Sequence, residues 1–380
     1  MHILIIPSWY INTYNSLSGI FFKQQAEVLS KKNQVGVISI QEIGIKSILI
    51  EKKIDFGIFI STINQVATYQ IQYPALIRLT SLREYIKKKF FIYLFKKYTK
   101  NNGIPDIVHL HSFNHGTLAI WLKENYSIPY VITEHSTAFA EKLISYQDLK
   151  KAQQVFKLSS HNIAVSNELK KLLETQFLET FQYIPNMVNI ESFVPNEKNE
   201  KNEFIFINIA FLYSYKNQSM LIKSFFKAFK HNNNIRLIIV GHGPELTKLN
   251  KIVKTLKLEN QVTLFGKAKR SEIITLLQNS DAFVLSSLYE TFGVVLIEAL
   301  ACGVPVISTK SGGPESIIID DRIGLLSDIN ENDLANKMKK MKKDITLYNA
   351  NFLRQYAIEN FSEKVVSNKL NTIYTNITGK

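Results

Sequence analysis

Short aliphatic runs alternate with amphipathic stretches along the whole chain, and this alternation constrains its fold more than any other feature. In the first half the aliphatic runs lie at residues 2–6, 35–40, 107–110, 130–133 and 162–164. The second half repeats the scheme at residues 204–209, 236–240, 262–265, 282–285 and 304–308. Strands that are apolar on both sides are typical of a parallel sheet covered by helices on both faces. The sequence therefore predicts an α/β protein.

Two similar halves indicate two domains, which suits a chain of 380 residues. The polar stretch from Pro195 to Glu203 has no apolar periodicity and reads as the linker. We expect one domain over residues 1–195 and another over residues 204–361, each a doubly wound, Rossmann-like parallel sheet. Such sheets bind ligands at the carboxyl ends of their strands, so we expect the two domains to face an interdomain cleft. The last helical pattern, residues 362–380, is expected to pack back on the first domain.

Composition excludes several classes of protein. Apolar residues make up 46% and charged residues 21%, as in ordinary globular proteins, and the single cysteine, Cys302, excludes an internal disulfide and a four-cysteine zinc site. No apolar run approaches the roughly 20 residues that span a bilayer. The first residues lack the basic region of a signal peptide, so we expect a cytoplasmic location. A net charge of +14 attracts nucleic acid, anionic lipid and phosphorylated substrates alike.

The segment from Ser286 to Pro305 carries the strongest chemical signal. Glu290 precedes a helix expected to open at Gly293 and to be capped by Thr291, and Glu298 lies about two turns into it. The backbone N–H groups of Phe292, Gly293 and Val294 would then face a phosphate group. The two carboxylates would lie on the order of 12 Å apart, too far for the roughly 5–9.5 Å of a glycosidase pair. That spacing suits one long ligand with hydroxyls at both ends, such as a sugar nucleotide.

The alternative is that both glutamates are ordinary surface charges. Apolar neighbours on both sides of Glu298 make this harder to accept for that residue. A buried carboxylate needs either a ligand or a fixed cation.

These residues resemble glycosyltransferase family 4, whose members are retaining enzymes of the GT-B fold. The resemblance rests on Glu290-x-Phe292-Gly293-x4-Glu298, then on Gly312-Gly313-Pro314-Glu315, and on Gly241-His242-Gly243-Pro244 after an earlier strand. It implies that the second domain binds the donor and the first lies on the acceptor side.

Looser matches to the family lie in the first half. Gly19 resembles the glycine that approaches the donor phosphate, although a plain turn glycine is the alternative. His135 follows a strand and resembles the histidine that contacts the donor hexose, although an isolated histidine is often structural. His109, His111 and His115 invite a metal interpretation, but no cysteine or aspartate pair accompanies them, and we expect no metal site.

The sequence departs from the family where an arginine and a lysine usually clamp the phosphates. Lys216 fits the lysine, but Phe211 stands where the arginine is expected. Arg270 is a replacement only by its charge. We therefore expect weaker or differently supplied neutralisation of the diphosphate.

The resemblance implies transfer of a hexose or N-acetylhexosamine from a nucleotide diphosphate sugar, with retention, to a saccharide acceptor in cell-surface polysaccharide or lipopolysaccharide biosynthesis. It implies no cofactor beyond the nucleotide sugar, and catalytic roles for His135 and Glu290. The alternatives are a pseudoenzyme that binds sugar nucleotide without turnover, supported by Phe211, and a nucleotide-sugar epimerase.

The stretch from Arg78 to Lys100 is basic and rich in aromatic residues. It indicates a helix on an anionic membrane surface, and hence a lipid-linked acceptor and a peripheral location on the inner face of the cell membrane. The alternative is a helix that covers the sheet with a solvated charged face. We expect no nucleic-acid partner, because no binding module accompanies the charge.

Overall fold

The chain forms two compact units. The computed structural model describes residues 1–380 except 13–17, 51–53, 78 and 197–201, so Arg78 and most of the predicted linker lie outside the described residues. Unit 1 comprises Met1–Val165, Lys170–Ile184 and Ser367–Lys380, and unit 2 comprises Ser166–Leu169 and Pro185–Val366. Residues 185–195, which the sequence alone assigns to the first domain, group with unit 2. There the Arg354 guanidinium donates to the carbonyls of Ile190 and Phe193.

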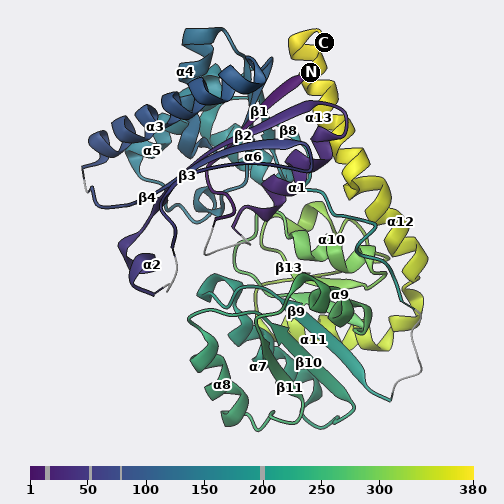
Figure 1. Ribbon diagram of the computed structural model, residues 1–380. Helices are drawn as coiled ribbons and strands as arrows, with labels where there is room; N and C mark the ends of the chain where they lie inside the picture. Colours follow the sequence, from purple (N-terminus) through teal and green to yellow (C-terminus); the bar gives the residue numbers. More distant parts are fainter. Residues whose placement is uncertain (13–17, 51–53, 78, 197–201) are drawn as a thin grey trace. The chain divides into compact units, whose positions relative to one another are not determined.

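Unit 1 is built on an eight-stranded sheet in the order β3-β4-β2-β1-β5-β6-β7-β8 (Figure 1). All neighbouring strands are parallel except β3 and β4, which form a hairpin. The strands are β1 (His2–Pro7), β2 (Gln34–Ile43), β3 (Gly57–Ile63), β4 (Val66–Pro74), β5 (Ile107–His111), β6 (Tyr130–Glu134), β7 (His161–Ala164) and β8 (Gln182–Tyr183).

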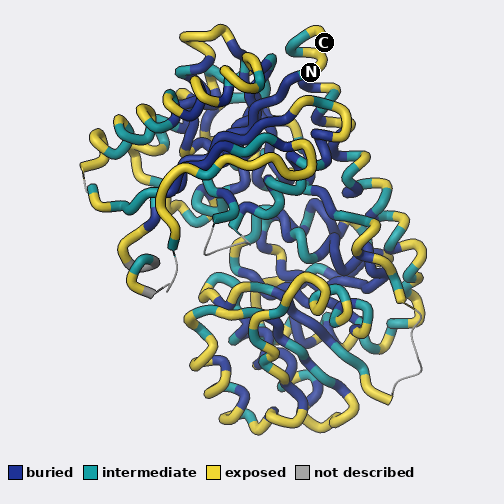
Figure 2. Tube along the Cα trace, viewed as in Figure 1, coloured by how far each residue is buried: buried dark blue, intermediate teal, exposed yellow. Residues whose placement is uncertain are grey.

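Helices cover both faces of this sheet. In Figure 1, α3 (Thr80–Asn102), α4 (Gly116–Tyr126) and α5 (Tyr146–Leu158) lie on one face, and α1 (Ile20–Ser30) and the end of α13 (Glu363–Thr378) lie on the other. The remaining elements are α2 (Ile45–Ile50), η1 (Phe113–His115), η2 (Thr137–Phe139) and α6 (Asn167–Phe177). The central strands are fully buried, whereas the edge strand β3 is almost entirely exposed (Figure 2).

Unit 2 is a six-stranded, fully parallel sheet in the order β11-β10-β9-β12-β13-β14. Its strands are β9 (Phe204–Ile209), β10 (Ile235–Val240), β11 (Val262–Gly266), β12 (Ala282–Leu285), β13 (Val306–Thr309) and β14 (Gly324–Ser327). Its helices are η3 (Ser214–Lys216), α7 (Gln218–Phe229), α8 (Leu246–Thr255), α9 (Arg270–Gln278), α10 (Val294–Ala301), η4 (Pro314–Ser316), α11 (Glu331–Lys343), η5 (Ile345–Leu347) and α12 (Ala350–Phe361). The predicted fold of two α/β domains on parallel sheets is confirmed.

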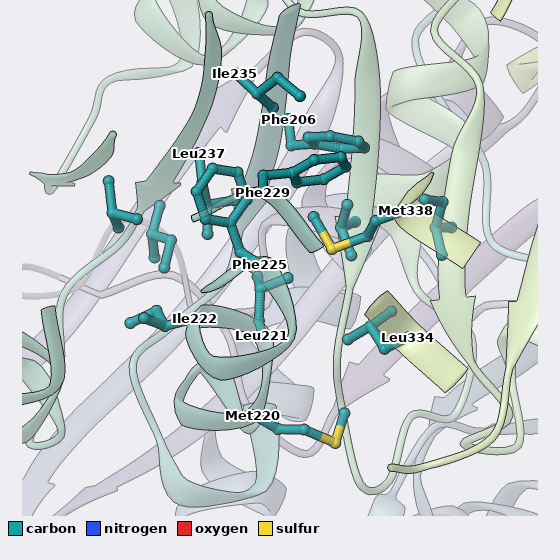
Figure 3. Close-up of a cluster of buried hydrophobic side chains, with 14 of the residues drawn as sticks. Phe206, Met220, Leu221, Ile222, Phe225, Phe229, Ile235, Leu237, Leu334 and Met338 are labelled. Atoms are coloured by element: carbon teal, nitrogen blue, oxygen red, sulfur yellow. The ribbon is translucent and has the colours of Figure 1, made fainter. Parts of the chain in front are cut away.

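Aromatic and aliphatic side chains hold the helices of unit 2 on its sheet. Phe206 of β9 stacks on Phe229 of α7 with ring centroids 5.5 Å apart, and Leu334 and Met338 of α11 join the same cluster (Figure 3). The apolar face of these helices thus packs on strands that are apolar on both sides, as the periodicity predicts.

The hairpin of β3 and β4 was not predicted, and its turn shows why. Asn64 and Gln65 connect the strands with φ of 49° and 64°, so both are left-handed without any glycine. Asparagine tolerates this conformation, but the usual Asn-Gly signal of a two-residue hairpin is missing.

Close packing of β2 against α3 generates a stability prediction. A Cβ at Gly36 would lie 2.0 Å from the hydroxyl of Tyr98, a fully buried ring whose hydroxyl also lies 2.6 Å from Nε2 of His2. We expect Gly36→Ala to lower the free energy of unfolding by about 1–3 kcal/mol in urea denaturation. Gly44→Ala is the matched control, since nothing lies within 4 Å of its Cβ. Equal midpoints for the two variants would contradict the prediction.

Candidate functional site

The predicted donor-side residues of unit 2 meet at one edge of its sheet. Lys216 follows β9, Gly241 follows β10, Glu290 follows β12, and Gly312 follows β13. Because all strands of this sheet are parallel, their carboxyl ends share an edge. The topology thus brings together loops that are far apart in the sequence.

Glu290 and Lys216 form an ion pair at this edge. The Lys216 ammonium donates to Oε2 of Glu290 at 2.5 Å, and the two side chains are only 16% and 12% exposed. The loop that carries Lys216 is held from the same side, because the Ser286 hydroxyl donates to the carbonyl of Lys216 at 2.8 Å. A cation and a carboxylate are therefore placed side by side with little freedom to move.

The Gly-Gly-Pro-Glu turn holds the main chain of Glu290. The Glu290 N–H donates to the carbonyl of Ser311 at 2.9 Å, and the Gly313 N–H donates to the carbonyl of Glu290 at 2.6 Å. A Cβ on Gly313 would lie 2.2 Å from the nitrogen of Phe292, so no other residue fits there without displacement. The two parts of the motif are thus one structural unit, with the turn positioning the glutamate.

Helix α10 begins differently from the prediction. It starts at Val294, its N-cap is Gly293 with φ of 93°, and no side chain caps it, so the prediction that Thr291 is the cap is wrong. A glycine in the left-handed conformation turns the chain sharply into the helix. The residue at the N-cap therefore has no side-chain oxygen to accept a hydrogen bond from the first turn. Phe292 is buried, with its ring 5.9 Å from that of Phe361, and anchors the turn.

Glu298 is buried and has a fixed cation. The guanidinium of Arg270 donates to its Oε1 at 2.7 Å and stacks 4.3 Å from the ring centre of Phe193. Burial raises the pKa of Glu298, and the charge of Arg270 opposes that rise. The sequence indicated that this carboxylate needs a ligand or a cation, and Arg270 is the cation.

The position of the expected arginine is aromatic. The Phe211 ring is 40% exposed and lies 5.2 Å from His242 and 6.0 Å from Tyr213. Gly241 is close to this loop, since a Cβ there would lie 1.9 Å from the carbonyl oxygen of Ala210. Phe211 therefore adds surface for a ligand to contact but no charge.

In unit 1, His135 lies beside the loop that carries Gly19. Gly19 is the N-cap of α1 with φ of 65°, and the next residues place the rings of Phe21 and Phe22 at 5.3 Å and 5.1 Å from the His135 ring. Nδ1 of His111 lies 3.1 Å from Nε2 of His135. The structure thus brings the two first-half motifs into one site.

Glu134 anchors this site and was missed in the sequence analysis. Its buried carboxylate accepts hydrogen bonds from the hydroxyl of Ser112 and from the N–H groups of Phe113, His135 and Ser136, at 2.7–3.0 Å. Burial raises the pKa of Glu134, and these four hydrogen bonds oppose the rise. A charged residue at the end of an apolar strand, next to a candidate histidine, was the available signal.

Four buried histidines of unit 1 are held in their neutral form. Burial lowers the pKa of His109, His115 and His135 to about 3, and that of His111 well below its ordinary value. Within the described residues, no group of three histidine, cysteine, aspartate or glutamate side chains is arranged to hold a metal ion.

The neutral histidines generate a prediction about pH. In the unfolded chain, histidines take up protons below a pH of about 6.5, whereas these four stay neutral in the folded protein. Their contribution to the free energy of unfolding is therefore fully present above a pH of about 6.5 and is lost as the pH falls toward about 3. We expect NMR titration of the folded protein to show four histidines without an inflection between pH 8 and 5. The urea-unfolded chain is the control, and its histidines titrate near 6.5. A midpoint above 5.5 for His135 would contradict the prediction.

Family models of known proteins match the two parts of the chain separately. A family model described as "Glycosyl transferases group 1" matches residues 189–360, and one described as "Glycosyltransferase Family 4" matches residues 50–192. N-acetyl-alpha-D-glucosaminyl L-malate synthase of Bacillus anthracis is 33% identical over 181 residues, which cover 47% of this chain and 46% of that protein. An uncharacterized glycosyltransferase of Methanocaldococcus jannaschii is 35% identical over 176 residues, 43% of each chain. The matches thus span less than half the length of these relatives.

Solved structures share the fold over the whole chain. Sucrose-phosphate synthase from Thermosynechococcus elongatus has a TM-score of 0.81 at 18% identity and 100% coverage of both chains. Anabaena HepE in complex with UDP has a TM-score of 0.75 at 18% identity, covering 99% of this chain and 100% of that one. Together, the two adjoining family models show that the chain belongs to glycosyltransferase family 4. The solved structures show that it has the GT-B fold.

Proposed function

We propose that this protein is a retaining, metal-independent glycosyltransferase that moves a hexose or N-acetylhexosamine from a nucleotide diphosphate sugar to a saccharide acceptor. The ion pair of Lys216 and Glu290 carries the proposal, because it sets a cation for a diphosphate beside an acceptor for sugar hydroxyls. HepE, a neighbour by fold, has been solved with UDP and with UDP-glucose, which supports a nucleotide sugar as the donor.

In this proposal Lys216 neutralises the charge that develops on the leaving diphosphate. The N-terminus of α10, opened by Gly293, adds the partial positive charge of a helix end. Glu290 accepts hydrogen bonds from the hexose, and Glu298, whose Oε1 is occupied by Arg270, accepts ribose hydroxyls with its second oxygen. The acceptor oxygen bonds to the anomeric carbon as the bond to the phosphate oxygen breaks, and a donor phosphate oxygen takes the acceptor's proton.

Replacing Glu290 tests this assignment. We expect Glu290→Gln to lower kcat about 100-fold, because an interaction made with the reacting sugar is lost, while the affinity for the free nucleotide stays nearly unchanged. The measurement is nucleotide release from a panel of UDP, GDP and ADP sugars, with nucleotide affinity followed by thermal shift. Glu359→Gln, at an exposed position of the same unit, is the control.

The same panel separates the alternatives. Nucleotide release from wild type supports a transferase, interconversion of the sugar indicates an epimerase, and binding without turnover indicates a pseudoenzyme. Equal turnover of wild type and Glu290→Gln would reject the role of Glu290.

We further propose that the acceptor is lipid-linked, in cell-surface polysaccharide or lipopolysaccharide biosynthesis, and that the protein works peripherally on the cytoplasmic membrane surface. The lipopolysaccharide outer core galactosyltransferase WaaB shares the fold with a TM-score of 0.72 at 16% identity, which agrees with such an acceptor. Among the described residues, no helix is both long enough and apolar enough to cross a bilayer.

Helix α3 supplies the surface for the membrane contact, but its most apolar side is not the side that is exposed. The most apolar side of the helix, with Phe91, Leu94, Phe95 and Tyr98, is buried in unit 1. The exposed side carries Leu82, Tyr85 and Tyr93 together with the lysines that we call the α3 basic surface, namely Lys88, Lys89, Lys96, Lys97 and Lys100. Exposed lysines interleaved with exposed rings suit the interface of an anionic bilayer.

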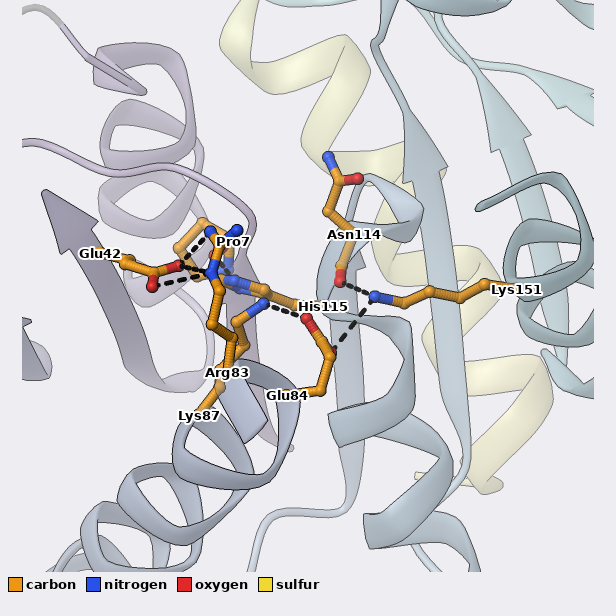
Figure 4. Close-up of polar contacts among 8 residues, drawn as sticks. All are labelled: Pro7, Glu42, Arg83, Glu84, Lys87, Asn114, His115 and Lys151. Carbon is orange, nitrogen blue, oxygen red and sulfur yellow. Dashed lines mark hydrogen bonds and ion pairs between the residues drawn. The ribbon is translucent and has the colours of Figure 1, made fainter. Parts of the chain in front are cut away.

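Other basic residues of the segment serve the fold instead. Arg83 donates to Glu42, and Lys87 and Lys151 both contact Glu84, at 2.6 Å and 3.5 Å (Figure 4). Lys151 also donates to the carbonyl of Asn114 at 2.6 Å. These contacts tie the start of α3 to its own unit and leave the α3 basic surface as the candidate for lipid.

Vesicle flotation tests the membrane proposal. We expect wild type to float with vesicles of phosphatidylglycerol and phosphatidylcholine at low ionic strength. We expect Lys96→Glu/Lys97→Glu to bind at least about 30-fold less, since each lysine near the surface is worth about 1 kcal/mol. The control is Lys251→Glu/Lys254→Glu, which reverses two exposed charges on α8. Equal loss in both double variants, or no binding by wild type, would overturn the proposal.

A further inference from the structure

Three buried imidazoles of unit 1 form one continuous array. The rings of His109 and His111, both on β5, are stacked with centroids 4.2 Å apart. His111 in turn reaches the residue that follows β6, with 3.1 Å between its Nδ1 and Nε2 of His135. One of these nitrogens must donate and the other accept.

Packing leaves the His111 ring little freedom. It lies against His109 on its own strand and against Phe22 of α1, with a centroid distance of 4.4 Å to the latter. His109 is itself held at both ends, because Nδ1 lies 2.6 Å from the hydroxyl of Tyr374 and Nε2 lies 2.8 Å from that of Thr133. The array is therefore anchored by the C-terminal helix α13 at the end away from His135.

The main chain on both sides of the His111–His135 contact is also held. Ser112 is buried with φ of 64° and ψ of 148°, a conformation that costs a residue other than glycine about 1–3 kcal/mol. Its hydroxyl donates to Oε1 of Glu134 at 2.7 Å, and the same oxygen accepts from the N–H of His135 at 2.9 Å. One carboxylate oxygen thus joins the turn after His111 to the backbone of His135.

We propose that His111 is a positioning residue that fixes the ring orientation of His135 and couples the tautomer of His135 to its own. If His111 donates through Nδ1, His135 must carry its proton on Nδ1. If His135 donates through Nε2, its Nδ1 is an acceptor and His111 carries its proton on Nε2. In either state the two remaining nitrogens, Nε2 of His111 and Nδ1 of His135, have opposite hydrogen-bonding roles.

Those two nitrogens have no hydrogen-bond partner among the described residues, and both are buried. A buried polar atom without a partner is costly, so a ligand group that bonds to Nδ1 of His135 would remove that cost. A hydroxyl can both donate and accept, so it can bond to Nδ1 of His135 in either tautomer, whereas an ionised phosphate or carboxylate can only accept. This step rests on the proposed function, with a sugar hydroxyl as the group recognised.

Variants of His111 test the proposal. Asparagine places an amide where Nδ1 lies, so His111→Asn should keep the contact with His135, whereas His111→Leu removes it. We expect kcat to fall about 10-fold or more in His111→Leu and much less in His111→Asn, with nucleotide affinity unchanged in both. Imidazole nitrogen NMR of the protein labelled with ¹⁵N-histidine should show a hydrogen bond at Nε2 of His135 in wild type and His111→Asn, and no such bond in His111→Leu.

The matched control is Tyr374→Phe, which perturbs the far end of the array without touching the His111–His135 contact. It should lower thermal stability while leaving the hydrogen bond at Nε2 of His135 and kcat as in wild type. If His111→Leu does not fold, His111→Gln replaces it, because its amide extends toward Nε2 rather than Nδ1.

The absence of a hydrogen bond at Nε2 of His135 in wild type, or an unchanged Nε2 signal and unchanged kcat in His111→Leu, overturns the proposal. Equal kcat losses in His111→Asn and His111→Leu overturn it as well. If wild type turns over no sugar nucleotide, the proposed function fails, but the NMR experiment still decides whether His111 positions His135.

Discussion

Both candidate sites are organised by carboxylates that are largely shielded from solvent. Each of these carboxylates needs hydrogen-bond donors or a cation beside it. Glu134 in unit 1 is compensated by four donors from two loops. In unit 2, Glu290 is compensated by Lys216 and Glu298 by Arg270. An uncompensated buried carboxylate would cost several kcal/mol, so each one fixes the position of its partners. The loops that carry the candidate residues are therefore held by charge as well as by packing.

The two sites differ in what they offer a ligand. The site of unit 1 holds neutral imidazoles, because burial lowers their pKa, and its Glu134 carboxylate accepts hydrogen bonds from the main chain. The site of unit 2 presents charges, with the Lys216 ammonium beside the Glu290 carboxylate. Neutral imidazoles suit hydroxyl groups, and the Lys216 ammonium suits an anionic group such as a phosphate.

Sequence periodicity was sufficient for the core of each sheet and insufficient at the edges. The strands next to β1 and β9 are apolar on both sides, and their positions follow from the sequence within a few residues. The hairpin of β3 and β4 was not predicted because its turn lacks glycine. The strands β8 and β14 were also not predicted. Helix α3 shows that composition alone does not tell which side of a helix is exposed. Its aromatic residues on the side that faces the sheet are buried, and those on the other side are exposed.

For the candidate site, the sequence by itself determined the residues and their order along the chain: the Glu290 motif, the glycines, Lys216 and His135. Chain order and spacing identify these residues because each follows a strand, and parallel strands bring their carboxyl ends together. Only the tertiary structure decided the partners. The pairing of Glu298 with Arg270 joins residues 28 positions apart, and the contact of His109 with Tyr374 joins residues 265 positions apart. Such contacts depend on the packing of helices on a sheet, which local sequence does not specify.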